Sequence, residues 1–153
     1  MSLRVSIEES YKEAIKSKQL EKANTLRLIK SAIKDKDIEN RSSESNKQIH
    51  DHQILALLQN LIKQRKDSIE SFKIASRDDL IVKEELEIDL ISQFLPKQLK
   101  EKETEEIIKE IIKKQSFSSL KDMGALMNNL KSEYAGSVDM AMAGKIAKLI
   151  LNN

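Results

Sequence analysis

Apolar residues recur at intervals of three and four positions along most of this chain, a spacing that places them on one face of an α-helix. Only three glycines and one proline are available to interrupt helices in 153 residues. Charged residues make up 34% of the chain and hydrophobic residues 39%, a balance typical of helices with one apolar and one solvated face. We therefore predict an all-α protein.

Two helical segments are expected at the N-terminus. Ser2 is suited to cap the first, because its hydroxyl can accept a hydrogen bond from a backbone N–H of the first turn, and this segment ends near residues 17–19. The second segment runs from about Glu21 to Glu39. Residues 40–46 then form a polar stretch without an apolar side chain, which predicts a loop.

A long third segment carries the clearest periodic pattern in the chain. The inward-facing row predicted for it is Leu55, Leu58, Ile62, Arg65, Ile69 and Phe72. Arg65 is the charged member of this row, and an unpaired buried charge strongly destabilises a fold. We expect its guanidinium to reach water or to pair with a carboxylate of the next helix. A role for Arg65 in binding a partner or ligand is the alternative.

The fourth segment opens at Ser76 or Asp78 and continues to Leu95. Pro96 ends it, because proline lacks the N–H of the helical hydrogen bond and disfavours helical backbone at the preceding residue. Pro96 is therefore the predicted boundary of an N-terminal domain, residues 1–96, built from about four helices.

Three shorter helices are expected in a small C-terminal domain, residues 97–153. The residues that mark their ends are, in chain order, Lys102 and Lys114, then Ser119 with Asp122 and Gly136, then Ser137 or Asp139. The inward-facing residues predicted for the last helix are Ala143, Ile146, Leu149 and Ile150.

Residue types and spacings exclude several kinds of active site. The chain has no cysteine, which removes thiolate nucleophiles, disulfides and cysteine-ligated metals. His50 and His52 are two positions apart, and on a helix they would point to opposite sides. Gly144-Lys145 lacks the preceding glycine and the following hydroxyl of a phosphate-binding loop. We predict no metal and no cofactor and identify no self-contained catalytic constellation, and the question of enzymatic activity stays open.

The first nine residues turn acidic where a signal peptide needs an apolar stretch. No later run approaches the length of a membrane span. We therefore expect a soluble, cytoplasmic protein without a membrane contact.

Positive charge is concentrated near the C-terminus, although the whole chain has a net charge of only +2. In the last three segments, Lys113, Lys114, Lys121, Lys131, Lys145 and Lys148 outnumber Asp122, Glu133 and Asp139. Lysines on one face could hold a phosphate backbone, and helix N-termini near Ser119 and Ser137 would add amide donors. The 3% aromatic content argues against base stacking, so a nucleic-acid role would rest on charge and shape.

Several short strings are more specific than the periodicity. They are Lys63-Gln64-Arg65-Lys66-Asp67-Ser68-Ile69, Ala75-Ser76-Arg77-Asp78-Asp79-Leu80, Glu87-Ile88, Phe94-Leu95-Pro96-Lys97-Gln98-Leu99, and Asp122-Met123-Gly124 through Met127 to Gly136 and Asp139. In order and spacing they resemble the GatB/YqeY family over essentially the whole chain. The sequence departs from the family pattern at Ser76, where glycine is expected, and at Gly144, where a longer polar residue is usual.

The resemblance implies a stand-alone YqeY-like protein, whose C-terminal domain is similar to the tail of the GatB subunit of glutamine-dependent tRNA amidotransferase. In that enzyme the tail helps to hold tRNA, and the portion of GatB that precedes the tail has no counterpart here. We therefore expect an RNA- or partner-binding surface at Lys121, Gly124, Lys131, Gly136, Asp139, Lys145 and Lys148. Arg65 and Arg77 are expected to be partner-binding or structural charges.

Three hypotheses for function follow. The first is an accessory protein that binds tRNA, or a tRNA-dependent amidation or synthetase complex, through the C-terminal domain. The second is participation in carbon–nitrogen ligation with glutamine as the amide donor. The third is a protein-interaction module that uses the row around Arg65 and the charged third and fourth helices. The sequence leaves the oligomeric state open.

Overall fold

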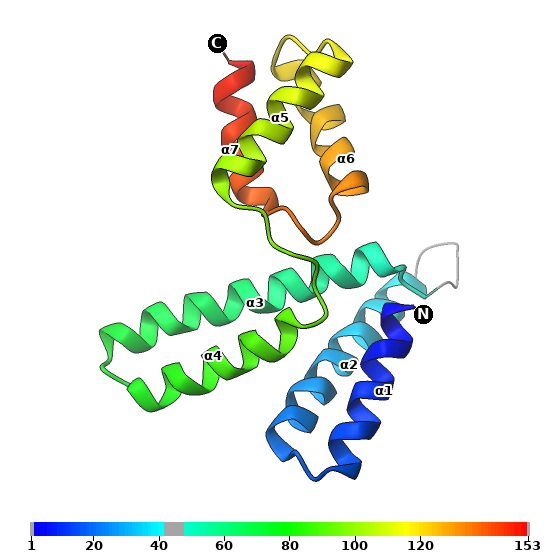
Figure 1. Ribbon diagram of the computed structural model, residues 1–153, viewed down its shortest axis with the longest axis vertical. Coiled ribbons are helices and arrows are strands. Elements are labelled where there is room, and N and C mark those ends of the chain that lie inside the picture. The colour runs from blue at the N-terminus through cyan, green and yellow to red at the C-terminus, as the bar shows by residue number, and fades with distance from the viewer. Residues whose placement is uncertain (1, 42–47, 153) are drawn as a thin grey trace. The chain divides into compact units, whose positions relative to one another are not determined.

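The computed structural model describes residues 2–41 and 48–152. These residues form seven α-helices and one short 3₁₀ helix and contain no β-strand, so the predicted all-α class is confirmed (Figure 1). The helices are α1 (Leu3–Lys16), α2 (Leu20–Arg41), α3 (Asp51–Ile74), α4 (Asp78–Ser92), α5 (Glu101–Gln115), η1 (Leu120–Asp122), α6 (Met123–Glu133) and α7 (Met140–Leu151). They divide into two compact units, Met1–Leu95 and Pro96–Asn153. None of the described helices is both long enough and apolar enough to cross a membrane.

The first unit consists of two helical hairpins, α1 with α2 and α3 with α4 (Figure 1). As predicted, Ser2 caps α1, and its hydroxyl accepts a hydrogen bond from the Val5 N–H at 3.2 Å. Each hairpin turns at a residue with left-handed backbone, Lys18 with φ 58° and Ser76 with φ 55°. This conformation favours glycine, the residue that the resemblance leads us to expect at position 76.

A single hydrophobic core holds the first unit together. Its buried residues are Ile7, Ala14, Ala23, Leu26, Ile29, Ile33, Ile49, Ile54, Leu58, Leu61 and Ile91. The inward row predicted for α3 is therefore partly wrong. Ile54 and Leu61 are buried, whereas Leu55, Ile62 and Phe72 are only half-buried. Neighbouring helical residues differ by about 100° in direction, so the predicted row lies along the edge of the buried face.

The structure differs from the sequence prediction at the end of α2 and at the start of α3. Asn40 and Arg41 belong to α2 and not to the predicted loop, and residues 42–46 of that loop lie outside the described residues. His50 is the N-cap of α3, while His52 lies inside the helix. Their rings stack with centroids 5.8 Å apart, so the prediction that they point to opposite sides is wrong. That prediction assumed helical backbone at both residues.

Helix α4 ends at Ser92, three residues before the predicted end at Leu95. The hydrogen bonds that follow span three residues, as in a 3₁₀ turn: the N–H groups of Phe94 and Leu95 donate to the carbonyls of Ile91 and Ser92. Pro96 disfavours helical backbone only at Leu95, the residue before it, so this effect alone does not explain the end at Ser92.

The second unit packs α5, α6 and α7 around a core of its own. Its buried residues are Ile108, Ile111, Leu126, Leu130, Val138, Ala143, Ala147 and Leu151. Gly136 has the predicted left-handed backbone, with φ 78°, in the turn after α6. Between the two predicted caps of α7 the structure selects Asp139, whose Oδ1 accepts hydrogen bonds from Ala141 and Met142 N–H at 3.0 and 3.2 Å.

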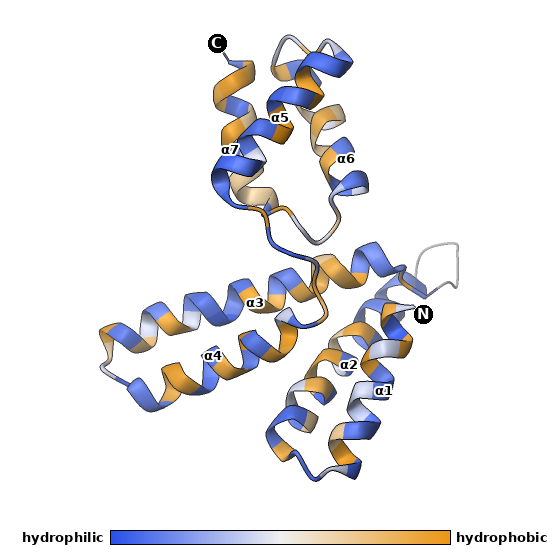
Figure 2. Cartoon of the chain, viewed as in Figure 1, coloured by the Kyte–Doolittle hydropathy of each residue, from blue (hydrophilic) through white to orange (hydrophobic). Residues whose placement is uncertain are grey.

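The inward face predicted for α7 needs a correction. Leu149 is 71% exposed, and Ala147 and Leu151 are buried in its place. Ile146 and Ile150 are half-buried. Figure 2 shows hydrophilic bands on the mostly hydrophobic ribbon of α7. Lys145 and Lys148 form its polar side, and Leu149, four residues after Lys145, lies beside that side and away from the core.

Candidate nucleic-acid interface

The four lysines predicted for RNA or partner binding lie on the surface of the second unit. Lys121 lies in η1, directly before α6, and Lys131 lies in the last turn of α6. Lys145 and Lys148 are three residues apart on α7 and therefore share one exposed face of that helix. No ion pair or hydrogen bond engages any of these four ammonium groups within the described part of the chain.

Two carboxylates close in sequence to these lysines accept hydrogen bonds from backbone N–H groups. Asp122 Oδ2 accepts hydrogen bonds from the backbone N–H groups of Ser118 and Ser119 at 2.8 and 3.2 Å. Asp139 occupies the corresponding donors at the start of α7. At α7 the Asp139 carboxylate therefore occupies two of the amide donors that the sequence analysis expected for phosphate. At the helix start after Ser119 the expectation stays a prediction, because Ser118 and Ser119 precede η1.

The two glycines of the predicted surface have different environments. Gly124 is exposed, and a Cβ built on it would meet no atom within 4 Å, so close helix packing does not require glycine there. Gly136 is buried, and its carbonyl accepts a hydrogen bond from the Gln98 side chain. Gly136 therefore shapes the turn before α7 and has no part in the exposed surface.

The acidic residues of the second unit are distributed unevenly. Five of its eight carboxylates lie in the first ten residues of α5: Glu101, Glu103, Glu105, Glu106 and Glu110. From Lys113 to the end of the described chain there are six lysines, all exposed, and three carboxylates. Two of these three carboxylates, Asp122 and Asp139, already accept the backbone hydrogen bonds described above. The end of α5, η1, α6 and α7 therefore carry more exposed lysines than carboxylates, and lysine meets a phosphate as a point charge.

Both arginines singled out in the first unit are paired. Arg65 is only 8% exposed, and its Nε donates to Glu87 Oε2 on α4 at 2.8 Å, while its Nη1 donates to the Leu61 carbonyl at 2.9 Å. Glu87 is the carboxylate of the next helix that the sequence predicts. Arg77 is exposed and bonds Asp79 two residues later, at 3.1 and 3.2 Å. This contact holds the pKa of the Asp79 carboxyl below its ordinary value.

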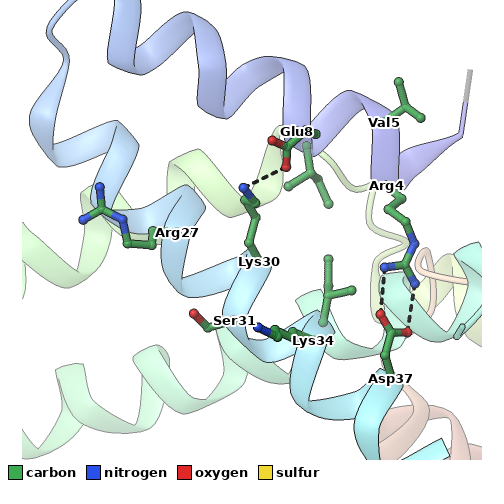
Figure 3. Close-up of a pocket in the computed structure, with 10 residues that line it drawn as sticks. Arg4, Val5, Glu8, Arg27, Lys30, Ser31, Lys34 and Asp37 are labelled. Carbon is green, nitrogen blue, oxygen red and sulfur yellow. Dashed lines mark hydrogen bonds and ion pairs between the residues drawn. The ribbon is translucent and has the colours of Figure 1, made fainter. Parts of the chain in front are cut away.

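A groove between α1 and α2 was not predicted from the sequence (Figure 3). It encloses about 600 Å³ and is bridged by two ion pairs from one helix to the other. Arg4 holds Asp37 through two hydrogen bonds of 2.9 and 3.0 Å, and Lys30 meets Glu8 at 2.8 Å. Arg27 and Lys34 also line the groove, and neither has a carboxylate partner among the described residues, so the groove keeps an excess of positive charge.

These pairs lower the pKa values of both carboxyl groups. Hydrogen bonds from Arg4, together with the Ile49 N–H at 2.9 Å, hold the pKa of buried Asp37 below its ordinary value. The hydrogen bond from Lys30 lowers the pKa of Glu8. Asp37 and Arg4 are 33 residues apart, and local patterns carry no signal for a contact at that distance.

Comparison with known proteins gives one family. The family model described as Yqey-like protein matches residues 4–151. An uncharacterized Schizosaccharomyces pombe protein is 36% identical over 95 residues, which cover 62% of this chain and 73% of that protein.

Two budding-yeast proteins, each named altered inheritance of mitochondria protein 41, mitochondrial, are also similar. The one from Saccharomyces cerevisiae is 36% identical over 84 residues, 55% of this chain and 43% of its own length. The one from Vanderwaltozyma polyspora is 27% identical over 153 residues, 94% of this chain and 80% of its own length. The match therefore spans less than half of the Saccharomyces cerevisiae protein.

Proposed function

The chain belongs to the Yqey-like protein family, and from this premise we propose that it is an accessory protein that binds tRNA through its second unit. The lysines proposed to make contact are Lys121, Lys131, Lys145 and Lys148. A complex for tRNA-dependent amidation or aminoacylation is the proposed setting, with the chemistry performed by other proteins. We propose a cytoplasmic location, while the names of the two budding-yeast relatives include the word mitochondrial.

The observation that carries this proposal is the set of exposed lysines without a carboxylate partner. An ammonium group that is already paired gains little from a phosphate, because it must first give up its partner. The four proposed lysines have no such partner within residues 96–152 of the described chain. A phosphate that binds them also releases counterions from the RNA, which favours association.

The same geometry limits the binding to charge and shape. Two backbone amides at the start of α7 already bond Asp139, so they are not available to a phosphate. Lysine also lacks the planar fork with which arginine recognises phosphate through two hydrogen bonds. We therefore expect the second unit to bind the tRNA backbone without reading its sequence, and selectivity to come from the assembled complex.

The test is binding of the purified full chain to total tRNA across a salt series, with Lys131→Ala plus Lys145→Ala as the variant. Each lost phosphate contact makes the slope of log K against log salt shallower by about 0.7–0.9, so this variant should lower its magnitude by about 1.4–1.8. The matched control is Lys36→Ala plus Lys73→Ala, which removes two exposed lysines that pair with Glu39 and Glu70.

Saturable binding whose slope changes in the first variant and not in the control would support the proposal. Equal changes in both variants would mean that tRNA responds only to net charge, and would contradict a site in the second unit. Failure to bind at low salt would overturn the RNA role. Glutamine hydrolysis by the purified chain would favour carbon–nitrogen ligation in its place.

A further inference from the structure

The groove between α1 and α2, called here the α1–α2 groove, has two cations that no carboxylate of the described chain neutralises. Arg27 and Lys34 line it from α2, and both are exposed. Arg27 donates to neutral oxygens, of which the Tyr11 hydroxyl is nearest at 3.1 Å, and Lys34 has no ion pair or hydrogen bond among the described residues. Figure 3 shows both side chains turned away from Glu8 and Asp37, the two carboxylates of the groove, which are already paired. The uncompensated charge in the groove is therefore positive.

The two uncompensated cations lie on one side of α2, two turns apart. Arg27 and Lys34 are seven positions apart, a separation of about 10.5 Å along the helix axis. Ser31 lies between them on the same side, four residues after Arg27. The nearest carboxylates of α2 outside the groove, Asp35 and Glu39, are turned from this side by roughly 80–120°. A second helix laid along α2 presents side chains seven positions apart at the same spacing, so two of its carboxylates can meet both cations at once.

Apolar surface accompanies these charges at one end of the α1–α2 groove. Val5 of α1 lines the groove and is 44% exposed. Ile38 of α2 is 51% exposed and lies four residues after Lys34 on the same side of the helix. The ion pair between Arg4 and Asp37, the residues that directly precede these two, holds the two helices together at this end. A ligand that covers the whole side of α2 therefore needs acidic groups with an apolar group beside them.

We propose that the α1–α2 groove binds an acidic amphipathic α-helix of a partner protein. Two carboxylates of that helix, seven positions apart, would meet Arg27 and Lys34. An apolar side chain one turn further along it would lie on Val5 and Ile38. A groove between two packed helices is a common seat for such a helix, because its side chains fit between the rows of both.

Other occupants fit these features less well. An RNA backbone has phosphates for the cations but no apolar group to cover Val5 and Ile38, and Glu8 and Asp37 in the groove would repel it. Helix α4 of a second copy is acidic, but its contact with the α1–α2 groove would join two unlike surfaces and would not close into a dimer. The inference does not depend on the proposed RNA role, because it concerns the first unit.

The experiment titrates the isotope-labelled full chain with a synthetic helical peptide that carries glutamates seven positions apart and leucines beside them. The peptide has about 15 residues, roughly one turn more than residues 27–38 of α2. Saturable shifts of backbone NMR signals are expected in residues 4–12 and 27–38. Arg27→Gln plus Lys34→Gln should weaken binding about five-fold, since it removes two exposed charge contacts.

Two control variants separate the groove from net charge. Lys63→Gln plus Lys66→Gln removes two exposed lysines of α3 that do not line the groove, and it should leave peptide binding unchanged. Lys131→Ala plus Lys145→Ala removes two lysines of the second unit and should leave the shifts in the groove unchanged.

The peptide and the apolar end of the groove are tested separately. A peptide with lysines in place of the glutamates should bind several-fold more weakly. Val5→Gln should weaken binding of the glutamate peptide about three-fold, because it removes the burial of a half-exposed valine. Ile74→Gln, which replaces an apolar residue that is 88% exposed and outside the groove, should have no effect.

Several results would overturn the proposal. They are equal binding of the two peptides, equal losses in the groove variant and the α3 control, and shifts that are largest outside the groove. If Arg27→Gln plus Lys34→Gln lowers the salt slope of tRNA binding and leaves peptide binding unchanged, the groove belongs to RNA and the proposal fails. Concentration-dependent shifts of the free protein that this variant abolishes would assign the groove to a second copy, which also overturns it.

Discussion

Replacing Glu87 by alanine should destabilise the first unit mainly through the charge that it leaves on Arg65. The guanidinium is held by Glu87 at 2.8 Å and by the Leu61 carbonyl at 2.9 Å, in a residue that is 8% exposed. Removing one partner of a buried ion pair costs roughly 3–5 kcal/mol. The Glu87 side chain is 21% exposed, so water can replace part of its carboxylate, and we expect about 2–3 kcal/mol.

Two further variants separate the uncompensated charge from the loss of packing. Arg65→Met plus Glu87→Met should recover most of the lost stability, because apolar residues of similar volume often replace a buried ion pair without cost. Glu70→Ala breaks the exposed Lys73–Glu70 pair on the same α3 and should cost less than about 0.5 kcal/mol.

The assay is urea unfolding followed by far-UV circular dichroism, together with hydrogen exchange of the α3 and α4 amides. Urea is uncharged and leaves ion pairs unscreened, and the exchange data assign the loss to the first unit when the two units unfold separately. The reasoning would be refuted by a Glu87→Ala variant within about 0.5 kcal/mol of the wild type, or by a double variant as unstable as Glu87→Ala.

Two further predictions concern single backbone and charge positions. The folded pKa of Asp37 is lowered by Arg4, so its stabilising contribution is present above the unfolded pKa of about 3.9 and is lost as the pH falls through the lower folded value. Asp37→Asn should therefore lower the urea midpoint at pH 7, with the difference from wild type shrinking below about pH 4; a difference that grows in acid would contradict this. Ser76→Gly should raise stability and Gly136→Ala should lower it, by about 1 kcal/mol each, because both positions have left-handed backbone. Thermal unfolding checks this pair, and changes of the same sign would count against it.

The features that sequence analysis predicted correctly depend on neighbours within one helical turn or on a simple electrostatic requirement. Ser2 and Asp139 cap their helices because a short polar side chain before an apolar pattern meets free N–H groups. The carboxylate partner of Arg65 follows from the cost of an unpaired buried charge.

The features that it missed depend on how helices meet. The contact from Arg4 to Asp37 joins residues 33 positions apart. The exposed position of Leu149 could have been predicted, because it lies beside Lys145 on the polar side of α7. The groove between α1 and α2 exists only where these two helices pack against each other. Sequence reasoning did contain the evidence against amide donors at α7, since a carboxylate that caps a helix also occupies its free N–H groups.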